Sequence, residues 1–182
     1  MKKMAFMAVA FLVAVCVLLT GCGKKLNGDD GKTLGVTHKE FVSLYNKSLE
    51  RGMGKLNGDF EETTDNRVTR YAIELENGIQ ISTSTKEGEE NIFSISLLGK
   101  RGDPQFYNYA EKLLLCLEGA EKTEVEEFVT EMKAESASNK RHDKLKNWEK
   151  LQTTIGKFKV MFSVVQSLDQ DTMYIKFDDG RW

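Results

Sequence analysis

The sequence predicts an α+β domain with a mostly antiparallel sheet of about five strands and about three helices packed on one face. Three observations lead to this prediction. Two alternating runs of apolar residues flank Asn77-Gly78, residues with N-capping chemistry open helical patterns at Thr37 and Asp103, and two more alternating runs close the chain. The expected order of elements is therefore α-β-β-β-α-α-β-β.

The first helix is predicted to begin after Thr37. Thr37 and Glu40 have the spacing of a capping box, in which each side chain bonds the backbone of the other residue. Apolar side chains then recur at helical spacing, and they form one stripe, which comprises Phe41, Leu44, Tyr45 and Leu49. The following segment, 55–66, is polar, and we expect it to be a loop.

Three strands are predicted next. Tyr71 to Leu75 and Ile79 to Thr83 each alternate between apolar and polar residues. The Asn77-Gly78 pair between them indicates a hairpin, because both residues tolerate the positive φ angles of a tight turn. A third alternating run, Ile92 to Leu98, completes an antiparallel meander with one buried face.

Two helices are predicted after the meander. Asp103 and Pro104 are suited to the N-cap and first position of the second helix, and Gly119 to its C-terminal end. Thr123 and Glu126 repeat the capping-box spacing, so we expect the third helix to begin there.

Two strands close the predicted domain. One is centred on Phe158 to Val164 and the other on Met173 to Phe177, and 168–171 is expected to be the turn between them. Glu40 to Ser43 resembles Glu127 to Thr130, which weakly indicates an internal duplication. The face of the sheet away from the helices should be polar and open, and it is expected to carry Ser82, Ser84, Ser94, Ser96, Lys157 and Lys159.

The N-terminus carries the most specific pattern in the chain. Lys2 and Lys3 precede an uncharged apolar run over 4–19, which ends in Leu19-Thr20-Gly21-Cys22. This combination resembles the signal peptide and lipobox of bacterial lipoproteins. An uncleaved membrane anchor is the alternative, but a run of 16 apolar residues is short for a spanning helix, which needs about 20.

The resemblance implies cleavage between Gly21 and Cys22 and a diacylglyceryl group on the Cys22 thiol. Two or more acyl chains hold a protein stably on a membrane. The expected organisation is a cleaved signal peptide over 1–21, a lipidated cysteine with a flexible tether over 22–36, and a single domain over 37–182. The expected location is the extracytoplasmic side of the cell membrane or outer membrane.

Charge and cysteine content limit the possible partners and the possible disulfides of the chain. Without residues 1–21, the chain has 24 basic and 28 acidic side chains, a formal net charge of −4. This balance argues against a nucleic-acid partner, which needs a basic patch. Cys116 would be the one free cysteine, so no intramolecular disulfide is expected, and its position in an apolar helical run favours a buried structural role.

No catalytic, metal-binding or cofactor-binding constellation is predicted. His38 and His142 are far apart in the sequence, and zinc sites need clusters of His and Cys. The sequence has no Gly-x-Ser-x-Gly elbow. The pairs Asp169/Asp171 and Asp178/Asp179 have cation-binding chemistry, but turns favour aspartate for backbone reasons alone.

The function that best fits these observations is a non-enzymatic lipoprotein that binds a protein partner or assists assembly at the cell envelope. An inhibitor or immunity-type protein is the alternative, and an envelope hydrolase is a weaker one. Two smaller hypotheses concern ligands. Tyr107 and Tyr109 are expected to cover the sheet rather than stack on a ligand, and the basic residues of 140–159 are expected to form a solvated face rather than a patch for anionic polymers.

Overall fold

The structure is a computed structural model, and it describes residues 25–28, 31–75, 78–138, 151–165 and 168–177. Three helices and seven strands occupy these residues. In chain order they are α2 (His38–Ser48), β1 (Glu61–Asp65), β2 (Val68–Glu74), β3 (Gln80–Lys86), β4 (Ile92–Lys100), α3 (Pro104–Leu115), α4 (Lys122–Ala137), β5 (Leu151–Ile155), β6 (Phe158–Val165) and β7 (Gln170–Phe177).

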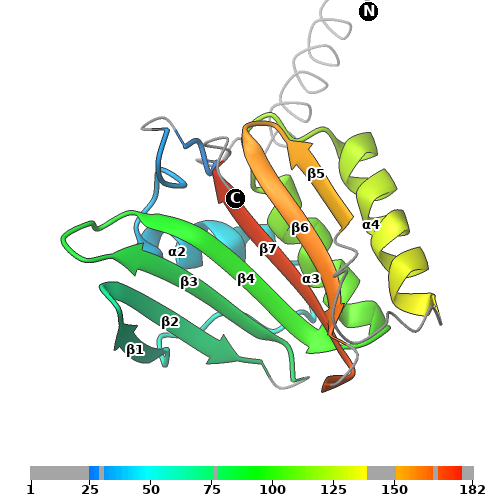
Figure 1. Cartoon of the computed structure of the whole chain (residues 1–182), viewed down its shortest axis with the longest axis horizontal. Helices are drawn as coiled ribbons and strands as arrows, with labels where there is room; N and C mark the ends of the chain where they lie inside the picture. Colours follow the sequence, from blue (N-terminus) through cyan, green and yellow to red (C-terminus); the bar gives the residue numbers. More distant parts are fainter. Residues whose placement is uncertain (1–24, 29–30, 76–77, 139–150, 166–167, 178–182) are drawn as a thin grey trace, which may run out of the picture.

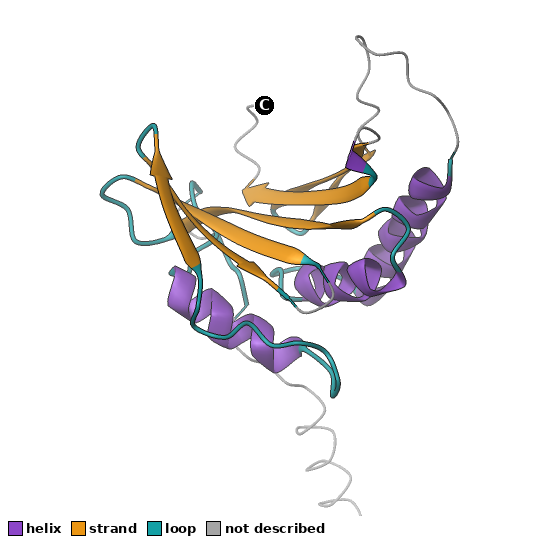
Figure 2. Cartoon of the chain, turned by 90° about the horizontal axis from the view of Figure 1, so that it is seen from below, coloured by secondary structure: helices purple, strands orange, loops and turns teal. Residues whose placement is uncertain are grey.

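The seven strands form one antiparallel sheet in the order β1-β2-β3-β4-β7-β6-β5 (Figure 1). All three helices lie on the same side of this sheet, and the other side is uncovered by helices (Figure 2). The predicted α+β class with an antiparallel sheet is therefore confirmed. Helices on one face only are what a sheet with alternating apolar and polar residues requires, because only one of its faces must be buried.

The core lies between the helices and the two central strands. β4 and β7 pair so that Ile95 is opposite Ile175 and Leu97 is opposite Met173, and all four side chains are buried. The ring centroid of Phe106 on α3 lies 6.2 Å from that of Phe162 on β6. Gly99 makes this approach possible, because a Cβ there would come within 2.8 Å of the Phe106 ring.

The predicted number and order of strands are wrong. β1 lies in the segment expected to be a loop, and all five of its residues are exposed, so it carries no alternating pattern. β5 follows directly on a polar stretch and has only five residues. Both are edge strands whose position is set by hydrogen bonds to one neighbour, β2 and β6 respectively.

Two of the three predicted helix starts are confirmed. Thr37 and Glu40 form the capping box of α2, and the Asp103 side chain accepts a hydrogen bond from the Gln105 amide at the start of α3. The third prediction is wrong, because α4 begins at Lys122 with Glu121 as its N-cap and no side-chain capping bond.

The segment predicted to be a flexible tether instead packs against the domain in its described part. Leu26, Leu34 and Val36 are completely buried. The amide of Leu34 donates to the carbonyl of Ile92 at 2.8 Å, and the Ile92 amide donates to the Val36 carbonyl at 2.9 Å. Apolar burial and pairing with the first residue of β4 thus bring this segment into the fold, and the domain begins before Thr37.

The topology has two similar halves. α2 precedes the edge strand β1 and then the consecutive strands β2, β3 and β4, and α4 precedes the consecutive strands β5, β6 and β7. The last strands of the two halves, β4 and β7, pair at the centre of the sheet. Phe41 on α2 and Phe128 on α4, which lie in the two similar tetrapeptides of the sequence, are both buried.

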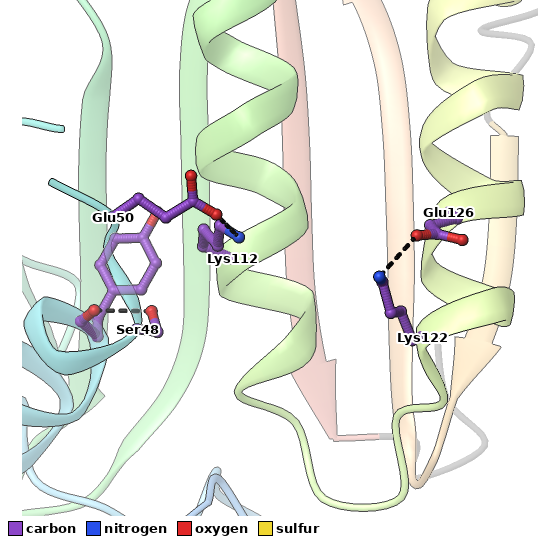
Figure 3. Close-up of polar contacts among 6 residues, drawn as sticks. Ser48, Glu50, Lys112, Lys122 and Glu126 are labelled. Carbon is purple, nitrogen blue, oxygen red and sulfur yellow. Dashed lines mark hydrogen bonds and ion pairs between the residues drawn. The ribbon is translucent and has the colours of Figure 1, made fainter. Parts of the chain in front are cut away.

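Two ion pairs on the helical side lie at the surface, each with at least one exposed partner. Lys112 on α3 pairs with Glu50 after α2, and the Lys122 Nζ lies 3.4 Å from Glu126 Oε1 one turn along α4 (Figure 3). Exposed pairs of this kind contribute about 0–1 kcal/mol each. In the same part of the molecule the Ser48 hydroxyl donates to the Tyr45 carbonyl at 2.7 Å, close to the end of α2.

No helix within the described residues is both long enough and apolar enough to cross a bilayer.

Candidate functional site

Two surfaces of the domain have the composition and shape of binding sites. The first is the side of the sheet that the helices leave open, here called the open face. Its central hydrogen-bonded group joins three strands: the Arg70 Nε donates to the Ser82 Oγ at 3.0 Å, and the Ser82 and Ser96 hydroxyls lie 2.7 Å apart. Arg70 is exposed and covers Ser82, which is only 2% exposed.

The centre of the open face is apolar and aromatic. Met161 and Tyr174 are directly opposite each other on β6 and β7, and Tyr174 is also opposite Ser96 on β4. Both side chains are half-buried. Tyr, Met and Arg are enriched in the parts of protein interfaces that contribute most to binding. The composition of this centre is therefore that of a protein-binding surface.

The open face is positively charged over β6 and β7, whereas its β1–β2 edge carries the carboxylates of Glu61, Asp65 and Glu74. Lys159 and Lys176 are directly opposite each other on β6 and β7. On the strands from β3 to β5, no described position of this face carries a carboxylate. These positions include Gln80, Ser82, Ser84, Ser94, Ser96, Leu98, Thr172, Tyr174, Lys176, Lys159, Met161, Ser163, Gln152 and Thr154. The prediction that Lys157 also lines this face is wrong. Lys157 lies in the β5–β6 turn, and its Nζ is 3.1 Å from Glu118 Oε2.

The second surface lies where β4 ends and α3 begins, and it is built around the buried carboxylate of Asp171. This side chain is completely buried. Its oxygens accept hydrogen bonds from the Tyr107 hydroxyl at 2.8 Å, from the Ser136 hydroxyl at 2.9 and 3.0 Å, and from the Gly102 amide at 3.0 Å. Every one of these groups donates, which is the arrangement that satisfies an ionised carboxylate.

Arg101 extends this network to the end of α4. Its Nε and Nη2 donate to the Ser136 carbonyl at 2.8 and 2.6 Å, and Nη2 also donates to the Ser138 carbonyl at 2.8 Å. The last carbonyls of a helix have no partner within the helix, and a cation there also interacts favourably with the helix dipole. Arg101 and Asp171 together join α3, α4, β4 and β7 at this end.

An open pocket of about 650 Å³ lies over this network. Lys133 stands at its side, with Nζ 5.6 Å from the centroid of the Tyr107 ring. Burial raises the pKa of the Tyr107 hydroxyl to about 12, so it stays protonated and remains a donor. The lining comprises Arg101, Gly102, Pro104, Tyr107, Lys133, Ser136, Ala137 and Asp169. No histidine is among these residues, and the Ser136 hydroxyl donates to the Asp171 carboxylate.

The other reactive side chains considered in the sequence have structural surroundings. His38 stacks on Tyr71 with 4.5 Å between ring centroids, meets the edge of Phe60, and its Nδ1 lies 2.7 Å from the Thr83 Oγ1. Burial lowers its pKa. Cys116 is buried as predicted, donates to the Lys112 carbonyl at 3.3 Å, and has a pKa raised by burial, all of which disfavour a reactive thiolate.

The predicted lipidation and cleavage residues, Cys22 and Gly21, lie outside the described residues, as do His142 and the pair Asp178/Asp179. Asp169 and Asp171 do not share a cation site. Asp169 is exposed before β7, whereas Asp171 belongs to β7 and accepts the bonds given above. Within the part of the chain that the structure describes, no group of three His, Cys, Asp or Glu side chains is placed to hold a metal ion.

Tyr107 and Tyr109 cover the sheet, as predicted. They are 4% and 3% exposed, and the Tyr109 hydroxyl bonds the backbone of Gly54.

The Asp171 network was not predicted from the sequence, although one signal for it existed. Asp171 stands two positions before Met173 in an alternating run, so it occupies a helix-facing position, where a charged residue needs hydrogen-bonding partners. Arg101 and Ser136 carry no comparable local signal, because their contacts join residues 35 positions apart.

No protein-family model, curated protein or solved structure matches this chain.

Proposed function

We propose that this protein is a lipid-anchored, non-enzymatic lipoprotein that binds a protein partner at the cell envelope through its open face. The observation that carries the proposal is a sheet covered by helices on one side only, whose other side has Tyr174 and Met161 at its centre and Arg70 on β2, three strands from Tyr174. The N-terminal resemblance to lipoproteins supplies the anchor at Cys22 and the envelope location.

The chemistry of the open face supports a partner with an acidic surface. Lys159 and Lys176 give its β6–β7 part a positive charge that an acidic patch complements, although the β1–β2 edge combines Arg70 with the carboxylates of Glu61, Asp65 and Glu74. The serines and threonines between these two parts offer hydroxyls as donors and acceptors. An apolar centre within a polar rim is the usual composition of a transient protein interface. No described residue of this face has the arrangement of a nucleophile and a base.

Site-specific photo-cross-linking in the bacterial envelope tests this proposal. A photoreactive phenylalanine analogue replaces Tyr174 on the open face, and in a matched control it replaces Glu131, which is exposed on α4. We expect a cross-linked protein adduct from position 174 and none from position 131. The proposal is abandoned if the affinity-tagged protein recovers no partner above background, or if both positions give the same adducts.

A second candidate, an inhibitor or immunity-type protein, is favoured by the two similar halves of the topology. α2 is followed by β1 to β4 and α4 by β5 to β7, so the halves match apart from the edge strand β1, and they meet at β4 and β7. Phe41 on α2 and Phe128 on α4 occupy equivalent positions in the two similar tetrapeptides. We infer from these positions and from the arrangement of the strands that the chain arose by internal duplication. Compact duplicated α+β proteins resemble known secreted enzyme inhibitors.

One feature of the described residues does not favour inhibition. The large apolar side chain that is exposed is Leu168, at 64%, rather than an aromatic residue on a protruding loop. Progress curves of envelope hydrolases and proteases, recorded with and without an equimolar amount of the purified chain, distinguish the candidates. Stoichiometric loss of one activity supports an inhibitor, whereas unchanged rates together with a cross-link from position 174 support the leading proposal.

A further inference from the structure

The N-terminal segment is attached to the domain only a few residues after the proposed lipidation site. Leu26 is completely buried, its amide donates to the Cys116 carbonyl at 3.0 Å, and its carbonyl accepts from the Glu118 amide at 2.9 Å. These bonds form a parallel bridge between Leu26 and Leu117. Further along, Leu34 and Val36 bond Ile92, so the segment is held at more than one point.

The distance between the anchor and this bridge is bounded by chain length. Four residue steps separate Cys22 from Leu26, and a fully extended chain spans at most about 3.6 Å per residue. The Leu26–Leu117 bridge therefore cannot lie more than about 14 Å from the Cys22 backbone. A domain held at this distance cannot turn freely over the membrane as one on a long flexible linker does.

Three elements run from the bridge to the opposite end of the domain. β4 begins beside Leu34 and Val36 and ends beside Arg101, and its nine residues extend over about 30 Å. α3 and α4 meet at the Leu117–Glu121 connection, and the sixteen residues of α4 carry the chain about 24 Å to Ser136. The Asp171 network, its pocket and the exposed Leu168 thus lie at the end remote from the bridge, as the course of β4 and α4 in Figure 1 illustrates.

We propose that the end of the domain formed by Lys25–Leu26, Leu117–Glu121 and the β5–β6 turn faces the lipid headgroups, and that the Arg101 pocket and Leu168 point away from the membrane. This inference rests on the proposed lipid anchor at Cys22. The membrane-facing end carries charges of both signs, including Lys25, Lys122, Glu118 and Glu121. Its orientation therefore comes from the short attachment and not from attraction to anionic lipid.

The orientation determines which surfaces a partner can reach. The pocket end projects by the length of β4 beyond the attachment point, and the open face, whose strands run from one end to the other, stands at an angle to the membrane. A partner in the aqueous phase can then contact Tyr174 and the remote pocket end, whereas the Leu26–Leu117 bridge is screened by the bilayer.

Fluorescence quenching of the full lipidated chain in phosphatidylcholine vesicles tests this orientation. In a Cys116→Ala background, a thiol-reactive fluorophore is placed either at Glu121→Cys, at the membrane-facing end, or at Leu168→Cys, at the remote end; both native side chains are exposed. Lipids with a spin label on the headgroup quench only at short range. We expect quenching at position 121 to exceed that at position 168 by at least threefold.

A linker variant provides the matched control. Twenty Gly/Ser residues inserted between Lys24 and Lys25 add a root-mean-square reach of about 25 Å and should make quenching at the two positions similar. Equal quenching at both positions without the insertion, or stronger quenching at position 168, overturns the orientation.

Two further readouts separate this inference from the anchor itself. Mass spectrometry of the N-terminal peptide reports the acyl chains on Cys22, and flotation with the vesicles reports membrane attachment. Loss of both overturns the anchor and the orientation together. An acylated chain that floats with the vesicles but is quenched equally at both positions overturns the orientation alone.

Discussion

Removal of the Asp171 carboxylate should destabilise the domain strongly, because two buried hydroxyls and the part-buried Gly102 amide converge on it. In Asp171→Ala the Tyr107 hydroxyl, the Ser136 hydroxyl and the Gly102 amide lose their acceptor. A buried donor without a partner costs about 1–3 kcal/mol. The two hydroxyls can rotate, and the adjoining pocket can admit water, so each cost falls at the lower end of that range. We expect a loss of about 3 kcal/mol in the free energy of unfolding.

Urea denaturation of the chain from residue 23 onward measures this loss. With a slope of about 2 kcal/mol per molar urea, the midpoint should fall by about 1.5 M. Asp171→Asn keeps one acceptor oxygen and should lose about half as much. The matched control is Thr172→Ala, the adjacent position on the opposite face of β7, which should change stability by less than about 0.5 kcal/mol. Midpoints of Asp171→Ala and Thr172→Ala that agree within error would refute this account of the network.

Three further predictions follow from the packing. Gly156→Ala should lower the free energy of unfolding by about 2–4 kcal/mol, since φ is +59° and a Cβ would come within 2.0 Å of a backbone carbonyl. Gly88→Ala has a similar φ of +79° but open space around the Cβ, so it should lower the free energy by only about 1 kcal/mol in the same urea titration. Because burial lowers the folded-state pKa of His38, its neutral form is favoured, so its contribution to stability is present above the unfolded pKa of about 6.5 and is lost as the pH falls below it. Thermal melts from pH 7.5 to 5 should therefore show a weaker pH dependence in His38→Gln than in His142→Gln, and identical profiles would contradict this assignment. Deletion of residues 25–36 removes three completely buried apolar side chains and should lower the free energy of unfolding by more than about 4 kcal/mol. Circular dichroism in urea measures this loss. A truncated chain as stable as the longer one would show that the segment is a flexible tether.

The features predicted correctly from the sequence are those whose causes are local. The capping box of Thr37 and Glu40 and the N-cap at Asp103 lie within one helical turn, so their residues specify the structure directly. The strands β2 and β3 were predicted from alternation, and Gly78 takes the positive φ that their connection requires. In each case the information lies in a few consecutive residues.

The features missed are those whose causes are distant in the sequence. β1 has no buried residue, and it exists because β2 offers it hydrogen-bonding partners. Leu26 is a single apolar residue in a polar, glycine-rich segment, and its burial depends on Leu117 more than 90 positions away. α4 begins two residues earlier than its capping-box pattern predicted, and its N-cap Glu121 makes no side-chain capping bond.

The open face was predicted from the sequence only in part. The polar character of the open face followed from alternation alone, because every second residue of a half-buried strand must face water. Its apolar centre did not, since the pairing of Met161 with Tyr174 and of Tyr174 with Ser96 depends on the order of strands in the sheet.

The sequence by itself determined the class of the fold, the capped helix starts, the alternating faces of the strands and the lipoprotein-like N-terminus. All of these features depend on residues that are close together in the chain. Only the tertiary structure decided that the sheet has seven strands with β4 and β7 at its centre, that Asp171 joins two helices to the sheet, and that the chain after Cys22 is bound to the domain from Leu26. The physical reason is that these contacts gain their free energy from burial and hydrogen bonding between distant segments, which no local pattern records.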